Sequence, residues 1–346
     1  MKIYFNRNQI DKSISRQFYA EWIKPVFPNK RHSIYGLKPE DLMICESPAD
    51  ADLFILPLTW NYYFEKGELD IAINILKLYH GFSKPIFTWV HGDYTFNIPK
   101  GDFITFHHNL YSNNLKDNEY AYPVIIRDPV QYIKSHGVAI LPKGDKPSIS
   151  FCGLADLNLI DRLISYCKDF IFKIKGKIFK PYLDLEMPLS GTRLRGKILK
   201  LLLRNADIDT NFIIRRNVDK IKINKAKYKF DYWNNMISTP FVLCVRGSGN
   251  FSTRFFEALA LGKIPILIDT NCVLPFEKYI QWDQHCLIIK ESDFDQISMI
   301  IKSFFKTIEE KKFKEIQVQN RKLWIENLSY SGFFYKTIKH FKINSI

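Results

Sequence analysis

The sequence has no run of about 20 apolar residues, so no segment predicts a helix that crosses a bilayer. The first ten residues lack the apolar core of a signal peptide. The six cysteines (45, 152, 167, 244, 272 and 286) show no CxxC or other metal-type spacing, and several lie within apolar runs. These absences favour a reducing compartment. We expect a cytoplasmic protein, at most peripheral on the inner face of the plasma membrane.

Low-complexity linkers and internal repeats are also missing, and 46% hydrophobic residues exclude a disordered chain. The length of 346 residues indicates two domains. Acidic residues are the minority, because 36 Asp and Glu stand against 50 Lys and Arg, a net charge of +14. This balance favours nucleotides, nucleic acid or an acidic membrane surface as partners. The basic residues are concentrated between Lys168 and Lys229. This concentration fits a surface that faces anionic lipid or a charged glycan, or an ordinary solvated face.

The chain predicts two successive α/β halves, because short continuous apolar runs alternate with helical stretches. In the first half we expect strands over 2–5, 53–58, 85–90, 104–108 and 123–127 and a helix over 69–79. A charged Pro/Gly segment at 141–147 then marks a boundary, which gives domains of residues 1–143 and 144–346.

In the second half we expect strands over 148–153, 211–216, 241–245, 264–268 and 286–289, and helices from about 157 and over 192–204, 228–238 and 252–261. The last helices are expected to pack back on the first domain. Two such halves leave a cleft between them, which is a usual place for ligands.

The segment 241–282 carries the strongest chemical signal. A buried strand ends in Arg246-Gly-Ser-Gly249, and a helix begins near Ser252, whose hydroxyl suits a cap. A strand, a glycine loop and a helix N-terminus together bind phosphate, because free N–H groups and the helix dipole point at the anion. Arg246 and Arg254 can bind a diphosphate, and Glu257 can hold ribose hydroxyls. Alternatively, the arginines pair with surface carboxylates and Glu257 is an ordinary helix residue.

The same segment resembles the hallmark of exostosin-type glycosyltransferases, a pattern of RG, S, R and EAL, then G-x-IP, LPF and I-x-W. The matching residues are Arg246, Gly247, Gly249, Ser252, Arg254, Glu257, Ala258, Leu259, Gly262, Ile264, Pro265, Leu274, Pro275, Phe276, Ile280 and Trp282. Upstream, DADLFILPLTW (50–60) and SISFCG (148–153) resemble the family's earlier motifs.

The resemblance implies a GT-B fold, with two Rossmann-like domains facing each other across a cleft and the nucleotide bound mainly by the second. It also implies inversion at the anomeric carbon without a catalytic metal or cofactor. The donor-binding set is expected to be Arg246, Gly247, Ser248, Gly249, Ser252, Arg254 and Glu257. Eukaryotic members carry a stem and membrane anchor that this sequence does not show. We therefore expect a compact bacterial relative that uses a UDP- or GDP-linked sugar in capsule or O-antigen assembly, with an oligosaccharide or lipid-linked glycan acceptor.

An inverting transfer needs a general base to take the acceptor proton. In this fold the base comes from a loop after a first-domain strand, and the strand at 85–90 runs into His91-Gly-Asp93. Asp93 is the first candidate and His91 the second. The other interpretation is that Asp93 caps a turn and His91 bonds nearby backbone. Further candidates for phosphate or acceptor contacts are Arg193, Arg195, Arg216 and His107; of the adjacent His107 and His108, at most one is expected to face the site.

Three other interpretations remain open. A fucosyltransferase-like enzyme with a GDP-sugar shares the fold, although Arg246-Gly247 stands where that group has Glu-Asn. A basic nucleic-acid-binding protein fits the charge, but no nucleic-acid motif is present, so we expect no nucleic acid partner. An inactive carbohydrate-binding relative is the third. The D-x-D triplets at 50–52, 207–209 and 293–295 lie outside strand ends, and none is interpreted as a metal site.

Overall fold

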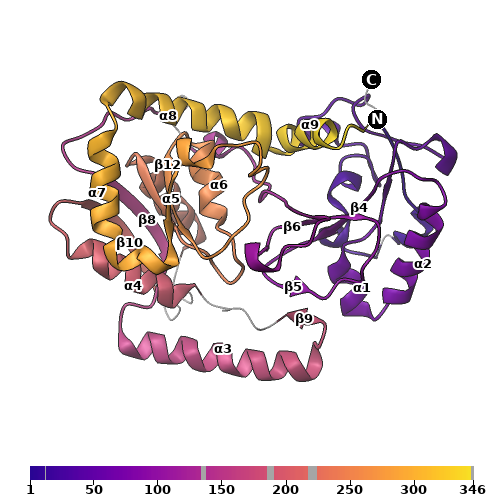
Figure 1. The fold of residues 1–346 in the computed structure, drawn as a ribbon, viewed down its shortest axis with the longest axis horizontal. Coiled ribbons are helices and arrows are strands. Elements are labelled where there is room, and N and C mark those ends of the chain that lie inside the picture. Colours follow the sequence, from indigo (N-terminus) through magenta and orange to yellow (C-terminus); the bar gives the residue numbers. More distant parts are fainter. Residues whose placement is uncertain (12, 134–137, 185–190, 217–223, 344–346) are drawn as a thin grey trace.

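The computed structural model describes residues 1–11, 13–133, 138–184, 191–216 and 224–343. It contains two parallel sheets in separate halves of the molecule, side by side in Figure 1. The predicted α/β class with two Rossmann-like domains is therefore confirmed. Within the described residues every helix is too short or too polar to span a bilayer.

The first sheet has the strand order β2-β1-β3-β4-β6-β7, and every neighbouring pair is parallel. Its strands are β1 (Lys2–Tyr4), β2 (Met43–Ile44), β3 (Leu53–Ile55), β4 (Ile86–Val90), β6 (Ile104–His107) and β7 (Glu119–Ala121). The helices α1 (Trp60–Lys66) and α2 (Leu69–His80) contribute to its core. All five residues of β4 are buried, as a continuous apolar run in a covered parallel sheet requires.

The second sheet has the order β10-β8-β11-β12-β13 and is also parallel. Its strands are β8 (Ser148–Leu154), β10 (Asp209–Arg215), β11 (Phe241–Cys244), β12 (Ile264–Asp269) and β13 (Leu287–Lys290). Apolar side chains of α4 (Thr192–Leu203) and α7 (Ile297–Thr307) share one core cluster of this sheet. Those of α5 (Lys225–Ile237) and α6 (Thr253–Ala260) share another. Helices thus cover both faces.

Two connections tie the halves together. The long helix α3 (Leu159–Phe179) leaves the second sheet and ends beside the first half, where β9 (Leu183–Asp184) pairs antiparallel with β5 (Thr95–Phe96). On the opposite edge of Figure 1, α8 (Glu310–Leu323) leads through a π-helical turn (Trp324–Leu328) to α9 (Tyr330–His340). The α9 residue Phe334 stacks edge-on against Trp22 of the first core at 4.9 Å.

One predicted strand is wrong. Residues 123–127 form no strand, and the sheet instead ends with β7 at Ala121. Pro123 has no N–H to donate to a neighbouring strand, so the ladder stops before it. The apolar side chains of Val124 and Ile126 pack against the second domain instead.

Candidate functional site

The glycine loop lies at the carboxyl end of β11, where parallel sheets of this kind bind ligands. Arg246 is buried at 6% exposure, Ser248 is exposed, and Ser252 is the N-cap of α6 with an extended backbone. The Ser252 hydroxyl makes no capping bond, so it is not committed to the helix's own first turn. The loop and helix N-terminus are arranged as the sequence predicts for an anion site.

The N-terminus of α4 is pressed against this loop. A Cβ atom on Gly191 would lie 2.1 Å from the Arg246 carbonyl oxygen, and one on Gly196 would lie 2.1 Å from the Asp156 carbonyl oxygen. Only glycine permits both approaches. The close packing brings Arg193 and Arg195, on the first turn of α4, to the carboxyl edge of the second sheet.

Arg195 is fixed by backbone carbonyl groups. Its Nη1 donates to the Leu154 carbonyl at 3.4 Å and its Nη2 to the Val245 carbonyl at 3.1 Å, so it joins the ends of two neighbouring strands. Arg193 donates to Asp169 of α3 at 2.9 Å.

Arg254 projects from α6 toward the same edge. Its Nη2 donates to the Cys152 carbonyl oxygen at 2.6 Å, and its guanidinium lies 4.5 Å from the centre of the Phe151 ring. Among the described residues, the buried Nε of Arg254 and the buried Nε of Arg195 have no hydrogen-bond partner.

Positive charge is concentrated and poorly hydrated at this edge. Burial, together with repulsion from Arg254 and Arg246, lowers the pKa of Arg195 to about 9. Burial also lowers the pKa of Arg246, and Arg193 adds to the shift. Desolvated cations that repel one another destabilise the site until an anion neutralises them. The arrangement can therefore bind a diphosphate.

Glu257 lies one turn further along α6, at 9% exposure. It accepts a short hydrogen bond from the Tyr232 hydroxyl of α5. Burial raises the pKa of Glu257, while the Tyr232 bond and the nearby Arg254 oppose that shift. Tyr232 holds one carboxylate oxygen of Glu257, which leaves the other as a hydrogen-bond acceptor.

Asp93 of the first domain meets the glycine loop. The Gly249 N–H favours the charged form of the Asp93 carboxylate, and a Cβ on Gly249 would lie 3.0 Å from the Asp93 Cα. Asn109 connects the two loops, because it donates to the Asp93 carbonyl at 2.7 Å and accepts from the Asn250 N–H at 2.6 Å. Asp93 is exposed, yet local desolvation raises the pKa of its carboxyl group. The first candidate base therefore stands beside the predicted donor loop.

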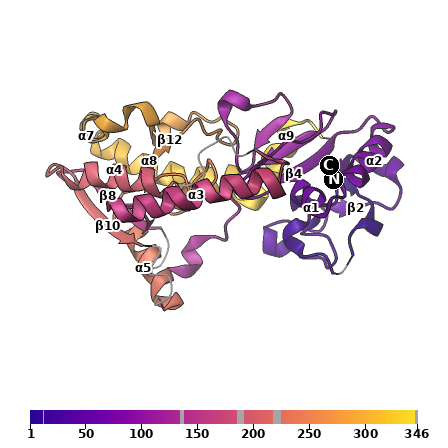
Figure 2. The same ribbon diagram turned by 90° about the horizontal axis from the view of Figure 1, so that it is seen from below.

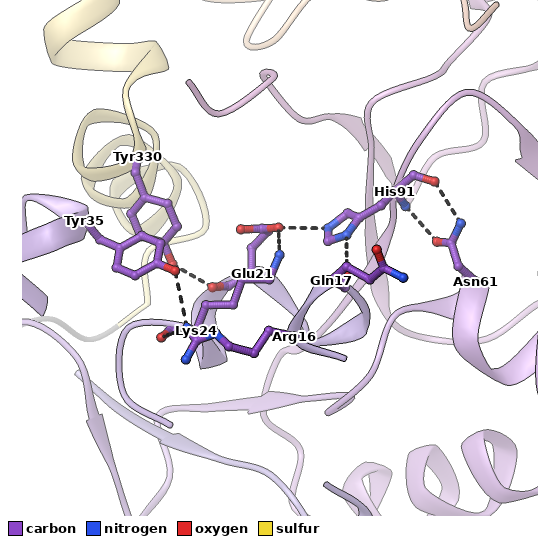
Figure 3. A network of polar contacts seen from close by, with 8 residues as sticks. All are labelled: Arg16, Gln17, Glu21, Lys24, Tyr35, Asn61, His91 and Tyr330. Carbon is purple, nitrogen blue, oxygen red and sulfur yellow. Dashed lines mark hydrogen bonds and ion pairs between the residues drawn. The ribbon is translucent and has the colours of Figure 1, made fainter. Parts of the chain in front are cut away.

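His91 is instead held inside a polar network (Figure 3). Its Nε2 lies 3.2 Å from Oε1 of Glu21, and its Nδ1 lies 3.4 Å from the Gln17 carbonyl oxygen. The Asn61 side chain bonds both the N–H and the carbonyl group of His91, each at 2.8 Å. Burial and then the Lys24 charge lower the pKa of His91 to about 3. So weak a base is a poor proton acceptor, and the geometry favours Asp93.

His107 ends β6 and His108 follows it, and their side chains point to opposite faces, as the alternation of side chains along a strand requires. His107, the residue predicted for the site, is buried with its Nε2 3.8 Å from Glu119 of β7. His108 turns the other way, stacks on His91 at 5.4 Å between ring centres and lies 5.8 Å from the Phe251 ring. The structure thus corrects the choice, because His108 and not His107 faces the glycine loop.

Arg216 lies outside the arginine group. It forms a bidentate ion pair with Asp161 at the start of α3, at 2.9 and 3.0 Å. The predicted phosphate or acceptor contact of Arg216 has no counterpart in this geometry.

A cavity of about 20 Å³ lies where the two domains meet, large enough for one water molecule. His108 and Tyr122 line it from the first domain, and Arg246, Ser252 and Thr270 from the second. The described residues contain no cluster of three or more His, Cys, Asp or Glu side chains placed to hold a metal ion.

Sequence reasoning did not single out Tyr232, Asn109, Asn250 or His108 as members of the site. Asn109 directly follows a predicted strand end, which was the one usable signal. Tyr232 carried no signal, because only the packing of α5 on α6 brings it to Glu257.

Comparison with known proteins finds similarity over part of the chain. Residues 172–304 match the model of the Exostosin GT47 domain. A probable glucuronosyltransferase, GUT1 of Oryza sativa subsp. japonica, is 35% identical over 72 residues, which is 21% of this chain and 17% of that protein. Exostosin-1 of Drosophila melanogaster is 33% identical over 101 residues, 29% of this chain and 13% of that protein. The matches thus span less than a fifth of these relatives.

Part of the second half of this chain is thus similar to the Exostosin GT47 domain. A glycosyltransferase structure from Rickettsia africae aligns with 84% of this chain and 89% of its own, at 11% identity and a TM-score of 0.36.

Proposed function

We propose that this protein is an inverting glycosyltransferase that moves a sugar from a nucleotide-sugar donor to a glycan acceptor without a catalytic metal. The observation that carries the proposal is the group of arginines around a glycine loop and a helix N-terminus, with Arg246 and Arg254 buried and Arg195 half-buried. These cations supply the positive charge that a leaving diphosphate needs.

In the proposed reaction the Asp93 carboxylate takes the proton of an acceptor hydroxyl. The hydroxyl oxygen attacks the anomeric carbon from the face opposite the diphosphate, so the configuration inverts. The bond between the anomeric carbon and the diphosphate oxygen breaks, and its electron pair stays on the diphosphate. Arg246, Arg254 and the N–H groups of α6 stabilise that charge, and the free Glu257 oxygen accepts from a ribose hydroxyl.

The proposed donor is UDP- or GDP-linked. The acceptor is an oligosaccharide or lipid-linked glycan, in a pathway that builds a bacterial capsule or O-antigen. The relatives named as a glucuronosyltransferase and an exostosin support sugar transfer as the reaction class.

The test is thermal stabilisation by UDP, GDP, CMP and dTDP and their sugars, with EDTA present. A nucleotide at about 100 times its Kd stabilises the folded state by about 2.7 kcal/mol. We expect one nucleotide series to raise the Tm of the wild type. The control variant Arg204→Ala, which replaces an exposed arginine at the end of α4, should show the same rise. Arg254→Ala should lose the rise.

A rise from GDP compounds alone, followed by fucose transfer, would favour the fucosyltransferase-like alternative. If no nucleotide stabilises the wild type, the donor site is refuted. Stabilisation that survives in Arg254→Ala would instead refute the role of that residue.

A further inference from the structure

Helix α3 presents its apolar side to solvent. Its buried positions, Ser165 and Gly176, are small, and Phe172 is the large apolar residue of the helix that packs against the first core. Its two acidic residues also turn inward, where Asp161 pairs with Arg216 and Asp169 with Arg193. This is the reverse of a surface helix that packs on its own core.

The outward face is a continuous apolar stripe. Ten large apolar side chains of α3 are exposed, among them Leu163 at 65%, Phe170 at 58% and Ile174 at 45%. They recur at three- and four-residue spacing over the whole helix, which at 1.5 Å per residue is about 30 Å long. A patch this extended marks an interaction surface.

Basic residues border the stripe on both sides. By helical spacing Lys168 and Lys175 lie along one border and Arg162 and Lys177 along the other, and all four are exposed. The inward turn of Asp161 and Asp169 leaves the outward face without a carboxylate. An apolar stripe between two cationic borders is complementary to a bilayer with anionic headgroups, because lysine stems pack on acyl chains while their ammonium groups reach phosphate.

The helix also lies beside the proposed acceptor side of the site. Figure 1 shows α3 along one edge of the molecule, and Figure 2, seen from that side, shows it crossing from the second half toward the first. Phe172 stacks on Tyr94, the neighbour of Asp93, at 5.4 Å, while Asp169 reaches Arg193 of the arginine group.

We propose that α3 docks this protein on an anionic membrane, lying in the headgroup plane with Leu163, Phe170 and Ile174 inserted. This inference rests on the proposed function. Docking through α3 would place the cleft at the bilayer surface and favour an acceptor that is carried on a membrane lipid. A second copy of the chain fits the same face less well, because it would bring cationic borders together without carboxylates to pair them.

The test is co-sedimentation with vesicles of 30% phosphatidylglycerol in phosphatidylcholine, against vesicles of phosphatidylcholine alone. We expect wild type to bind the anionic vesicles, and Leu163→Ser/Phe170→Ser/Ile174→Ser to bind more than about tenfold more weakly. Lys168→Gln/Lys175→Gln should lose about fivefold per lysine, and added salt should weaken the wild type in the same direction. The matched control is Leu78→Ser/Met299→Ser, which removes exposed apolar residues elsewhere and should bind like wild type.

A second measurement reports insertion directly. Cys167 lies on the outward stripe and is the exposed cysteine of the six. An environment-sensitive fluorophore attached there should shift to the blue on addition of anionic vesicles. Circular dichroism and nucleotide-induced Tm shifts should be unchanged in every α3 variant. A failure of membrane docking can then be distinguished from a failure of the proposed donor site.

Absence of vesicle binding at low salt would overturn the proposal. So would a wild-type dimer in light scattering that the triple serine variant converts to a monomer, because the stripe would then belong to a second copy. Equal binding by the triple serine variant and wild type would also overturn it.

Discussion

The two domains offer opposite chemistry at the edges that meet. The second-domain edge gathers the buried Arg246 and Arg254 and the half-buried Arg195, and burial lowers the pKa values of Arg195 and Arg246. The first-domain edge offers one carboxylate, Asp93, beside histidines whose pKa values burial lowers to about 3. Under the proposed function, the second-domain edge binds the anionic donor and the first-domain edge accepts the proton of the acceptor.

The largest expected effect separates these two roles. Asp93→Asn keeps the shape of the side chain but removes the proton acceptor, so we expect kcat to fall by about 10²- to 10⁴-fold. The nucleotide Kd should stay within about twofold of wild type. Steady-state kinetics and calorimetry measure both quantities, and a matched loss of affinity would assign Asp93 to binding.

The same residue predicts a pH dependence. The pKa of the Asp93 carboxyl is raised, so the group stays protonated to a higher pH than an ordinary aspartate. We expect kcat/KM to fall as pH decreases through that raised pKa, because the protonated carboxyl cannot take the acceptor proton. A rate profile flat down to the ordinary pKa of aspartate would contradict this.

Arg246→Ala tests the opposite edge. Loss of a charge-assisted contact to diphosphate should weaken nucleotide binding by about 10- to 100-fold, while the variant still folds. Arg216→Ala is the matched control, since Arg216 pairs with Asp161 on α3 and should leave the nucleotide Kd unchanged. Equal losses in the two variants would mean that net charge, rather than the site, controls affinity.

The buried histidines predict acid sensitivity. His91, His107 and His108 have lowered pKa values in the folded state, so between about pH 6.5 and 3 the unfolded chain binds more protons than the folded one. Stability is therefore complete above pH 6.5 and decreases as pH falls, by about 1.4 kcal/mol per pH unit for each histidine. Denaturant unfolding of wild type and His107→Gln at several pH values measures this. His107 is flanked by Glu119, Lys116 and His108, and its removal should make the decline shallower.

The smallest expected effect concerns the Glu257 partner. Tyr232→Phe removes the hydroxyl that donates to Glu257, and we expect about a tenfold weaker nucleotide Kd with a loss of about 1 to 3 kcal/mol of stability. Tyr228→Phe on the same helix is the control, because the Tyr228 ring, not its hydroxyl, contacts Arg215. An unchanged Kd in Tyr232→Phe would show that Glu257 needs no positioning.

Much of this arrangement follows from local pattern. Continuous apolar runs predicted the parallel strands, and the order of Arg246, Ser252, Arg254 and Glu257 along a strand, loop and helix predicted their common edge. Prediction failed where long-range packing decides the outcome. The run at 123–127 is as apolar as a strand, but Pro123 ends the ladder and its neighbours pack on the other domain. The alternation of side chains along a strand predicted that only one of His107 and His108 faces the glycine loop. The pairing of β6 with its neighbouring strands decided that this residue is His108.

The sequence by itself determined the two α/β halves, the glycine loop with its arginines and the candidate base, because each depends on residues close together in the chain. Only the tertiary structure decided that Asp93 meets Gly249, that Tyr232 holds Glu257 and that α3 turns its apolar stripe to solvent. Those facts depend on how separately formed elements pack. The helical spacing of α3 is the same whether its stripe faces a core or a membrane, and the inward ion pairs of Asp161 and Asp169 fix which way it faces.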